Sequence, residues 1–470
     1  MASRLGVRLV DDALPAGAGL ADLVGLAVRR NPRRAHLLVS AVLGKHVPTD
    51  PRLVYGSGLL LGELVRARLR AEQPSGPGLL ADALRGVPGA AAGLRDLLRA
   101  PQVPMEAIVL GYAETATALG HSVADALGSA YYLHSTRRPV TGFATYGGFE
   151  EEHSHATSHL LLPADAAALD RDVPVVLVDD ELSTGRTVLN TIEALHAVRP
   201  RGRYVLAALV DLRGPADRAR MEELADRLGT RIDAVALASG QVELPAGVLE
   251  AGQTLVDELT ARPTRPSEAP TAFDVSRVEL DWPAGIPDGG RHGFLPEHRD
   301  RLEKDLARMS DAIASGMGDG ASRVLVLGFE ELMYAPLRLA EALADVLPRV
   351  DVRYSTTTRS PVLAVDDPGY AIRTRLTFPS HDDPADGPGE RYAYNVAPAS
   401  AQDGFDRIVL VVDDIADTPA LADGLLRRLR ALAPTLLATV PSRKGVQPRT
   451  GVQPRRDAPP RKDAPPRRGG

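Results

Sequence analysis

The 470-residue sequence contains no cysteine and only one tryptophan. Without cysteine there is no disulfide scaffold, no thiolate metal site, no iron–sulfur cluster and no cysteine nucleophile. Long apolar runs are also missing, and a run such as VVLV at 175–178 is far too short to span a bilayer. The first residues, MASRLGVRLVDD, lack the apolar core of a secretory signal, so we expect a cytoplasmic protein with no membrane partner.

The charge of the chain is divided unevenly between its body and its end. The formal net charge is −6, but residues 441–470 carry nine Lys or Arg against two Asp, a net of +7, which leaves −13 for residues 1–440. An acidic body argues against broad nucleic-acid binding by folded domains. The basic end consists of short tandem repeats rich in Pro and Arg, and we expect it to be disordered. It is either a solvated tail or a weak electrostatic handle for nucleic acid or an acidic protein.

The length predicts two or three domains, each able to bury a core. A Pro-rich stretch at 263–274 is typical of a linker, so we expect one domain at 1–262, a second at 275–440 and the tail at 441–470. Both domains alternate short apolar runs with longer helical patterns, which predicts an α/β fold with a parallel sheet in each. The runs expected to be buried strands are 107–110, 173–178, 204–210, 324–327 and 408–412.

The two regions repeat the same blocks in the same order. The first has IVLGYAETATALGHSVADAL, HSTRRPV and VPVVLVDD, and the second has LVLGFEELMYAPLRLAEAL, STTTRSPV and RIVLVVDD. In both, a strand ends in Gly-aromatic, a helix follows, a Thr-Arg segment leads to Pro-Val, and another strand ends in Asp-Asp. Three matching blocks in order predict an internal structural duplication.

The segment 175–187, VVLVDDELSTGRT, carries the strongest chemical signal. Its four apolar residues predict a buried strand, and Asp179 and Asp180 follow at the carboxyl end, where open α/β sheets bind ligands. The turn STGRT at 183–187 then leads into a helix, whose N-terminal N–H groups can hold a phosphate. Gly185 lets the backbone approach that phosphate closely, and the paired carboxylates suit the vicinal hydroxyls of a ribose. The pattern therefore predicts a sugar-phosphate site.

This segment resembles the signature with which type I phosphoribosyltransferases bind phosphoribosyl pyrophosphate: four apolar residues, two acids and T-G-x-T. A Walker A loop is excluded, because Gly44-Lys45 is preceded by Val39 where Gly is required. The resemblance implies a Rossmann-like domain and a Mg²⁺ cofactor held by the acidic pair, directly or through water. It implies that phosphoribosyl pyrophosphate, which we call the donor, is contacted by Asp179, Asp180, Ser183, Thr184, Gly185, Arg186 and Thr187.

The resemblance also implies a pyrophosphate loop and a basic lid. The loop is best matched by 109–117, VLGYAETAT, and the segment Tyr55-Gly-Ser-Gly58 ranks second. The lid is matched by 134–159, a long connection with little apolar periodicity, in which Arg137 and Arg138 are expected to pair with pyrophosphate oxygens. The residues assigned to the pyrophosphate loop are Ala113, Glu114, Thr115, Ala116 and Thr117.

Three histidines near the end of the lid segment leave several interpretations open. His153, His155 and His159 follow a run of acids that ends at Glu152. The spacing suits a divalent transition metal. It equally suits an acid, a clamp or a contact with the acceptor, and solvent-facing histidines without a role are the third alternative.

The whole chain resembles the phosphoribosyltransferase-like proteins of bacterial tellurium-resistance and stress-response gene clusters. In that family an orotate-phosphoribosyltransferase-like domain precedes a domain named after a Thr-Arg-Ser-Pro (TRSP) motif, which stands at 358–361 here. The segments LLVSAVLGKHVP (37–48), GYAETATALGH (111–121) and EEHSHATSH (151–159) carry the rest of the resemblance.

The second domain departs from the signature of a working site. After its Asp413-Asp414 the T-G-x-T turn is gone, and Pro419 stands where the phosphate-binding turn is expected. We therefore expect a degenerate copy that forms a lid, a dimer surface or an acceptor pocket. Arg359 of the TRSP motif aligns with Arg137 or Arg138 of the first copy, and we assign it to the acceptor or lid.

These observations predict a Mg²⁺-dependent phosphoribosyltransferase that uses phosphoribosyl pyrophosphate to glycosylate a base-like acceptor. The expected product is a nucleoside-like metabolite of a stress-response pathway. The alternative is a non-catalytic sensor that binds the same donor. The same residues serve the reverse reaction, the sequence does not identify the acceptor, and a homodimer stays an open alternative.

Overall fold

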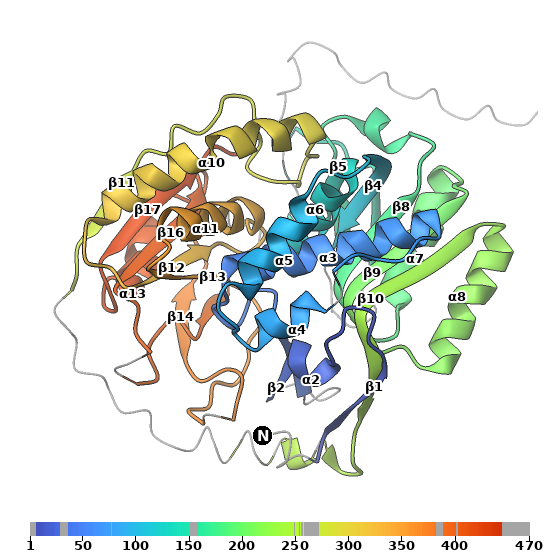
Figure 1. The fold of residues 1–470 in the computed structure, drawn as a ribbon, viewed down its shortest axis with the longest axis horizontal. Coiled ribbons are helices and arrows are strands. Elements are labelled where there is room, and N and C mark those ends of the chain that lie inside the picture. The colour runs from blue at the N-terminus through green and yellow to red at the C-terminus, as the bar shows by residue number, and fades with distance from the viewer. Residues whose placement is uncertain are drawn as a thin grey trace, which may run out of the picture.

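The computed structural model of the protein describes residues 6–28, 36–76, 78–138, 140, 142–150, 158–248, 250–252, 254, 257, 272–367, 369–381, 389–400 and 403–443. These residues form two open α/β sheets, with helices between the sheets and on their outer faces (Figure 1). We call the units around the first and second sheets the first and second domains. The expected linker lies outside the described residues over most of its length, and the basic tail lies outside them from residue 444 on.

The first sheet has six strands in the order β1-β10-β9-β8-β4-β5. β1 is antiparallel to β10, and the other five strands are parallel to their neighbours. Helices cover both faces of the parallel part, which is why its central strands read as nearly continuous apolar runs. The strands are β1 (Arg8–Ala13), β4 (Met105–Gly111), β5 (Gly128–His134), β8 (Val175–Leu182), β9 (Arg203–Asp211) and β10 (Arg231–Glu243).

The main helices of the first domain are α3 (Pro51–Arg70), α6 (Thr117–Leu127), α7 (Arg186–Val198) and α8 (Pro215–Leu228). Shorter segments are α2 (Leu20–Leu23), α4 (Leu79–Leu84), α5 (Ala90–Arg99) and the 3₁₀ turn η1 (Ala166–Leu169). Two small antiparallel hairpins stand beside the sheet. They are β2 (Val24–Val28) with β3 (His36–Ser40), and β6 (Gly147–Glu150) with β7 (Ser158–Leu161).

The interpretation of Tyr55-Gly-Ser-Gly58 as a second candidate loop is wrong, because this segment lies inside helix α3. Its glycines serve packing instead. A Cβ at Gly58 would lie 2.4 Å from the Cβ of Ser122, and one at Gly62 would lie 2.5 Å from the Cβ of Ala126. The glycines therefore let α3 and α6 approach closely.

The second sheet repeats the parallel part of the first. Its strand order is β11-β17-β16-β12-β13, which corresponds to β10-β9-β8-β4-β5, and all its pairs are parallel. This agrees with the predicted duplication, with one difference: β11 comes first in its domain, whereas β10 follows the other parallel strands. The strands are β11 (Val275–Val278), β12 (Arg323–Gly328), β13 (Asp351–Thr356), β16 (Arg407–Asp413) and β17 (Thr435–Val440).

The helices of the second domain are α10 (Pro296–Met317) and α11 (Tyr334–Val346), followed near the end by α12 (Pro419–Leu421), the π-helical turn η3 (Ala422–Leu426) and α13 (Arg427–Leu429). An extra hairpin pairs β14 (Arg375–Pro379) with β15 (Glu390–Tyr394). α11 faces α3 and α6 of the first domain, so the helical layers of the two domains meet in the middle of the molecule (Figure 1).

Each domain covers the edge strand of the other. Thr49, from the first domain, pairs with Tyr354 of β13, and Phe294, from the second, pairs with Tyr132 of β5. Both bridges are antiparallel and use two N–H···O bonds of 2.8–3.0 Å. Because β5 and β13 are edges of their sheets, the exchange satisfies backbone groups that would otherwise be exposed. The two domains are therefore joined in a nearly symmetric way.

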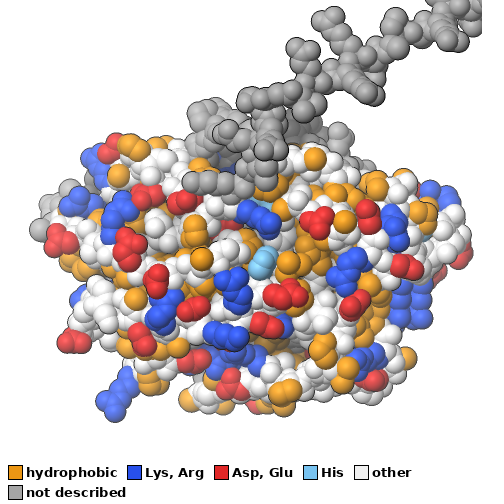
Figure 2. Space-filling view, turned by 90° about the horizontal axis from the view of Figure 1, so that it is seen from above, with side chains coloured by type: hydrophobic (Ala, Val, Ile, Leu, Met, Phe, Trp, Pro, Cys, Tyr) orange, Lys and Arg blue, Asp and Glu red, His pale blue; other side chains and the backbone are white. Residues whose placement is uncertain are grey.

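The part of the chain that the structure describes contains no helix both long and apolar enough to traverse a bilayer. Seen from above, the surface carries acidic and basic side chains intermixed rather than a single basic field (Figure 2).

Candidate active site

A polar cavity of about 450 Å³ opens at the carboxyl ends of β4 and β8. Three parts of the chain line it: β3 with the segment after it, the first sheet and its loops, and the TRSP segment of the second domain. The cavity brings together many of the residues that the sequence singled out. They are Ala113, Glu114, Thr115, Arg137, Asp179, Asp180, Ser183 and Arg359.

Three consecutive acids, Asp179, Asp180 and Glu181, line the cavity near the end of β8. The strand continues to Leu182, so the acids lie within its last residues rather than beyond it. The Asp180 N–H donates to Asp179 Oδ1 (2.9 Å). Burial raises the pKa of Asp180 and the nearby Glu181 raises it further, while Lys45 acts in the opposite direction. Such crowded carboxylates are stabilised by a cation or by hydroxyl donors.

The turn after β8 has the backbone that its sequence predicts. Gly185 has a φ of +74°, a conformation that residues with a Cβ rarely adopt, and α7 begins directly after it. A Cβ there would also lie 3.0 Å from Cδ of Arg213. Ser183 lines the cavity, and Thr184 and Thr187 lie beside it in the turn and the start of α7. The N-terminus of a 13-residue helix therefore stands next to the acids.

Arg186, which the resemblance assigned to the donor, lines a different surface hollow. That hollow lies between α7 and α8, where Arg186 is accompanied by Asn190 and Glu193. The side chain is exposed. The backbone of residue 186 still belongs to the first turn of α7, so its N–H, rather than its guanidinium, is the group near the predicted phosphate.

The predicted loop after β4 is confirmed as a turn between a strand and a helix. The peptide bond between Ala113 and Glu114 is cis. The Ala113 N–H donates to Ser135 Oγ (3.0 Å). Ala116 is the N-cap of α6, and Thr117, its first residue, donates from Oγ1 to the Glu114 carbonyl (3.3 Å). Ala116 and Thr117 are buried beneath the loop and do not line the cavity, whereas residues 113–115 do.

The predicted lid at 134–159 is not an irregular connection throughout, because β6 lies within it and pairs with β7, which begins there and ends at Leu161. His159 lies in β7 with a fully buried side chain, and its Nδ1 is 2.8 Å from Ser135 Oγ. Since Ser135 also accepts the Ala113 N–H, His159 supports the loop after β4 and does not cover the cavity as a lid residue. Glu152, His153 and His155 lie outside the described residues.

The two adjacent arginines of the predicted lid have different surroundings. Arg137 lines the cavity. Arg138 turns to the second domain, where its Nη2 lies 2.8 Å from Glu330 Oε2 and its guanidinium stands 5.8 Å from the ring centre of Phe329. Only the first of the two is therefore placed to contact a ligand in the cavity.

Sequence reasoning missed two basic residues after β3. Lys45 is buried, donates from Nζ to Thr115 Oγ1 (2.7 Å) and lies 4.0 Å from Glu114 Oε2. His46 lines the same cavity and has a buried Nε2 without a hydrogen-bond partner; burial, helped by Lys45, lowers its pKa to about 3. The segment 37–48 did carry the family resemblance, but its spacing to the acids is too long for a local motif.

In the second domain an internal ion pair occupies the corresponding place. Glu331, the counterpart of Glu114 in the duplicated block, lies 3.1 Å from Nε of Arg291. Asp413 Oδ1 accepts the N–H of Ala416 (2.9 Å), and Pro419 begins the helix there. The carboxylates of Glu331 and Asp413 therefore have partners within the second domain, which is consistent with the predicted loss of a sugar-phosphate site in this copy.

Glu331→Gln is expected to flatten the pH dependence of stability in acid. Burial by itself raises the pKa of Glu331, but Arg291 and Arg138 outweigh it and lower the pKa to about 2. A depressed pKa stabilises the fold above the ordinary value of 4.5, and this stabilisation is lost as the pH falls toward 2. The stability lost by wild type between pH 5 and pH 2.5 should exceed that of the variant by about 2–3 kcal/mol. Urea unfolding at several pH values measures the difference, and parallel curves would contradict it.

The carboxylates that line the cavity fit a magnesium ion that is also bound by a substrate. Among the described residues no group of three or more His, Cys, Asp or Glu is arranged to hold a metal by itself. Mg²⁺ commonly binds through one or two carboxylates, water and substrate phosphates. Asp179 and Asp180 offer such carboxylates, and burial together with the adjacent Glu181 raises the pKa of Asp180, so a further cation there would stabilise its ionised form.

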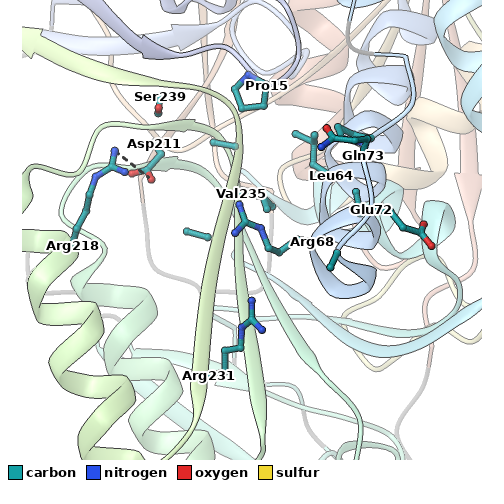
Figure 3. A pocket seen from close by; sticks show the side chains of 15 residues that line it. Pro15, Leu64, Arg68, Glu72, Gln73, Asp211, Arg218, Arg231, Val235 and Ser239 are labelled. Atoms are coloured by element: carbon teal, nitrogen blue, oxygen red, sulfur yellow. Dashed lines mark ion pairs between the residues drawn. The ribbon is translucent and has the colours of Figure 1, made fainter.

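A second hollow, of about 630 Å³, lies between the end of α3 and β10 (Figure 3). It is lined by arginines that already pair with acids: Arg231 lies 3.0 Å from Asp233, and Arg218 lies 3.9 Å from Asp211. It contains neither the acidic strand end nor the glycine turn of the first cavity, and we assign the chemistry to the first.

Comparison with protein families gives two matches in tandem. Residues 23–241 match the family described as phosphoribosyl transferase. Residues 288–429 match the family described as the TRSP domain, C-terminal to that transferase. No curated protein matches the chain.

Solved structures give matches over about a third of the chain. Adenine phosphoribosyl transferase from Trypanosoma brucei, in complex with AMP, pyrophosphate and ribose-5-phosphate, is 16% identical over 33% of this chain and 68% of that one, with a TM-score of 0.23. The enzyme from Giardia lamblia, complexed with 9-deazaadenine, is 18% identical over 33% and 82%, with a TM-score of 0.22. The enzyme from Rhodothermus marinus is 20% identical over 32% and 81%, with a TM-score of 0.22.

Proposed function

Since the chain belongs to the phosphoribosyl transferases that carry a C-terminal TRSP domain, we propose that it transfers the phosphoribosyl group of phosphoribosyl pyrophosphate to a base-like acceptor. One observation carries the proposal: the acidic end of β8, the glycine turn before α7 and the loop after β4 all meet at one cavity. Each suits a different part of the donor, and together they match its three parts.

The 5-phosphate is assigned to the turn before α7. Backbone N–H groups at the start of this helix and the hydroxyls of Ser183, Thr184 and Thr187 can donate to a phosphate dianion, and the helix dipole favours its charge. Asp179 and Asp180 lie just before the turn and accept from the ribose hydroxyls. Because the carboxylates would repel the phosphate, we expect the ribose to lie between them and the turn.

The pyrophosphate is assigned to the loop of residues 113–117. Lys45 and Arg137 bring positive charge to this part of the cavity, which suits a leaving group that gains negative charge. Magnesium, held through Asp179 and Asp180 and the donor's oxygens, would neutralise part of the same charge.

The reaction is a substitution at the anomeric carbon. The bond to the pyrophosphate oxygen breaks with its electron pair leaving on pyrophosphate, and a bond to an acceptor nitrogen forms, which then loses a proton. The transition state has oxocarbenium character, so the residues act mainly by positioning and by charge. Leu37, Leu38, Leu43 and His46 also line the cavity and suit the flat, partly apolar face of a base. The direct product keeps the 5-phosphate and is a nucleotide, and we further infer that it leads to a nucleoside-like metabolite made in the cytoplasm during a stress response.

The test is an assay of pyrophosphate release from phosphoribosyl pyrophosphate and Mg²⁺ with a panel of purine, pyrimidine and pyridine bases. Release that requires both the protein and one of the bases, with a matching new nucleotide by mass spectrometry, is the expected result. Tight donor binding by calorimetry without release for any base would contradict the transferase and favour a sensor. No donor binding would reject both.

A further inference from the structure

The TRSP segment of the second domain reaches the pyrophosphate loop of the first. Thr358 Oγ1 donates to Glu114 Oε2 (3.2 Å), and Arg359 Nε lies 3.0 Å from Glu114 Oε1. Arg359 and Ser360 also line the cavity that contains Asp179. Part of the wall of the candidate site in the first domain is therefore built by the second.

Glu330, which belongs to the second domain, also pairs with the guanidinium of Arg359. Its Oε2 lies 2.7 Å from Arg359 Nε and 2.8 Å from Arg138 Nη2, its Oε1 accepts from Arg391, and its side chain has no exposed surface. Burial by itself raises the pKa of Glu330, but the three guanidiniums outweigh it and lower the pKa overall. An ionised, buried Glu330 therefore holds Arg359 next to Arg138, which lies near the start of the predicted lid.

Resting on the proposed function, we propose that Arg359 contacts the pyrophosphate group of the donor, and that Glu330 is the residue that positions it. The partner of Arg359 in the first domain, Glu114, belongs to the loop assigned to pyrophosphate, and Lys45 approaches the same loop through Thr115. A guanidinium presents five N–H donors in a planar fork that matches phosphate oxygens, so it can hold carboxylates and a phosphate together. This replaces the broader assignment of Arg359 to an acceptor or lid.

The reciprocal contact in the second domain supports the same conclusion. There Thr136 Oγ1 donates to Glu331 (2.9 Å), as Thr358 does to Glu114. In that copy Arg291 closes onto the carboxylate at 3.1 Å, whereas Lys45 stays 4.0 Å from Glu114 beside an open cavity. Each domain thus sends a Thr-Arg segment into the other, and in the first domain an open cavity lies beside the carboxylate that this segment contacts.

The experiment is calorimetry on the full chain with three ligands, each with Mg²⁺: phosphoribosyl pyrophosphate, inorganic pyrophosphate and ribose 5-phosphate. Arg359→Ala should raise the Kd of the two pyrophosphate-containing ligands by about tenfold to a hundredfold, because it removes a charge-assisted contact. The Kd of ribose 5-phosphate, which lacks that group, should stay within about twofold. Arg359→Lys should fall between wild type and Arg359→Ala, because it keeps the charge and loses the fork.

Controls separate local from general effects. Arg277→Ala removes an exposed arginine that pairs with Asp417 in the same domain, and should leave all three Kd values unchanged. Glu330→Gln should weaken the pyrophosphate ligands and spare ribose 5-phosphate; if it does not fold, the Arg359 variants decide alone. Equal Kd values in Arg359→Ala and wild type, or an equal loss for ribose 5-phosphate, would overturn the inference while the proposed function stands. Absence of donor binding by wild type would instead reject the proposed function.

Discussion

Replacing both Asp179 and Asp180 with Asn is expected to abolish pyrophosphate release while leaving the fold intact. The two carboxylates are the acceptors assigned to the ribose hydroxyls, and they also offer the oxygen ligands that a magnesium ion takes. Asn keeps the size of each side chain but removes its charge and half of its acceptor capacity. We expect the rate to fall by at least about a hundredfold to a thousandfold.

The free energy of unfolding of this double variant should not fall with the rate, and we expect it to stay the same or to rise. Burial and the adjacent Glu181 raise the pKa of Asp180, so its ionised form is penalised in the folded protein. The variant should therefore unfold at the same urea concentration as wild type or at a higher one. The matched control is Asp311→Asn with Asp319→Asn, two exposed acids of the second domain, which should retain the wild-type rate. An undiminished rate in the Asp179/Asp180 variant would refute the site assignment.

Arg338→Ala is expected to lower the free energy of unfolding more than any other single substitution at the interface between the two domains. The Arg338 side chain is only 1% exposed. Its guanidinium binds Glu341 (2.7 Å) and Glu303 (2.8 Å) and stands 4.1 Å from the ring centre of Tyr55 in the first domain. Removing it leaves the buried Glu341 with Arg95 and Arg99 as its remaining cations and takes away the contact with Tyr55, and we expect a loss of about 2–3 kcal/mol.

The surroundings of Arg338 explain why the loss should affect both domains. Asp125 of the first domain accepts from the hydroxyls of Tyr55 (2.9 Å) and Tyr334 (2.7 Å), and Arg338 lies 3.8 Å from the same carboxylate. Burial raises the pKa of Asp125, and Arg338 is the strongest influence that opposes this. Without the arginine this carboxylate becomes harder to ionise and the contact between α6 and α11 weakens.

Urea unfolding followed by circular dichroism measures the loss in Arg338→Ala. The control is Arg227→Ala, which removes an exposed arginine paired with Glu193 and should cost no more than about 1 kcal/mol. A loss in Arg338→Ala as small as in the control would show that the buried network contributes little to stability.

The local elements of the fold could be predicted because their signals are short-range. The apolar run at 175–178 is buried in β8, and the acids and Gly185 follow in the predicted order. The loop at 109–117 is likewise a turn between β4 and α6. In each case a strand, a turn and a helix lie within about a dozen residues, so periodicity and turn chemistry suffice.

The errors arose where packing decides the role of a residue. Gly56 and Gly58 suggest a loop by composition, yet close packing against neighbouring helices places them inside α3. His159 was assigned to the acceptor or lid, yet pairing of β7 with β6 buries it against Ser135. The roles of Lys45 and His46 were missed because Glu114 lies about 70 residues away in the chain, and the acids at 179–181 that share the cavity lie more than 130 residues away.

The sequence by itself determined the family, the two α/β domains and the acidic strand end with its glycine turn, because these depend on contiguous residues. Only the tertiary structure decided which residues from distant segments share the cavity. It brings Lys45, Glu114 and Arg359 together although they come from three separate stretches and two domains. The physical reason is that ion pairs and buried contacts depend on distance in space, and that distance is fixed only when α3, α6 and α11 pack and each domain covers the other's sheet edge.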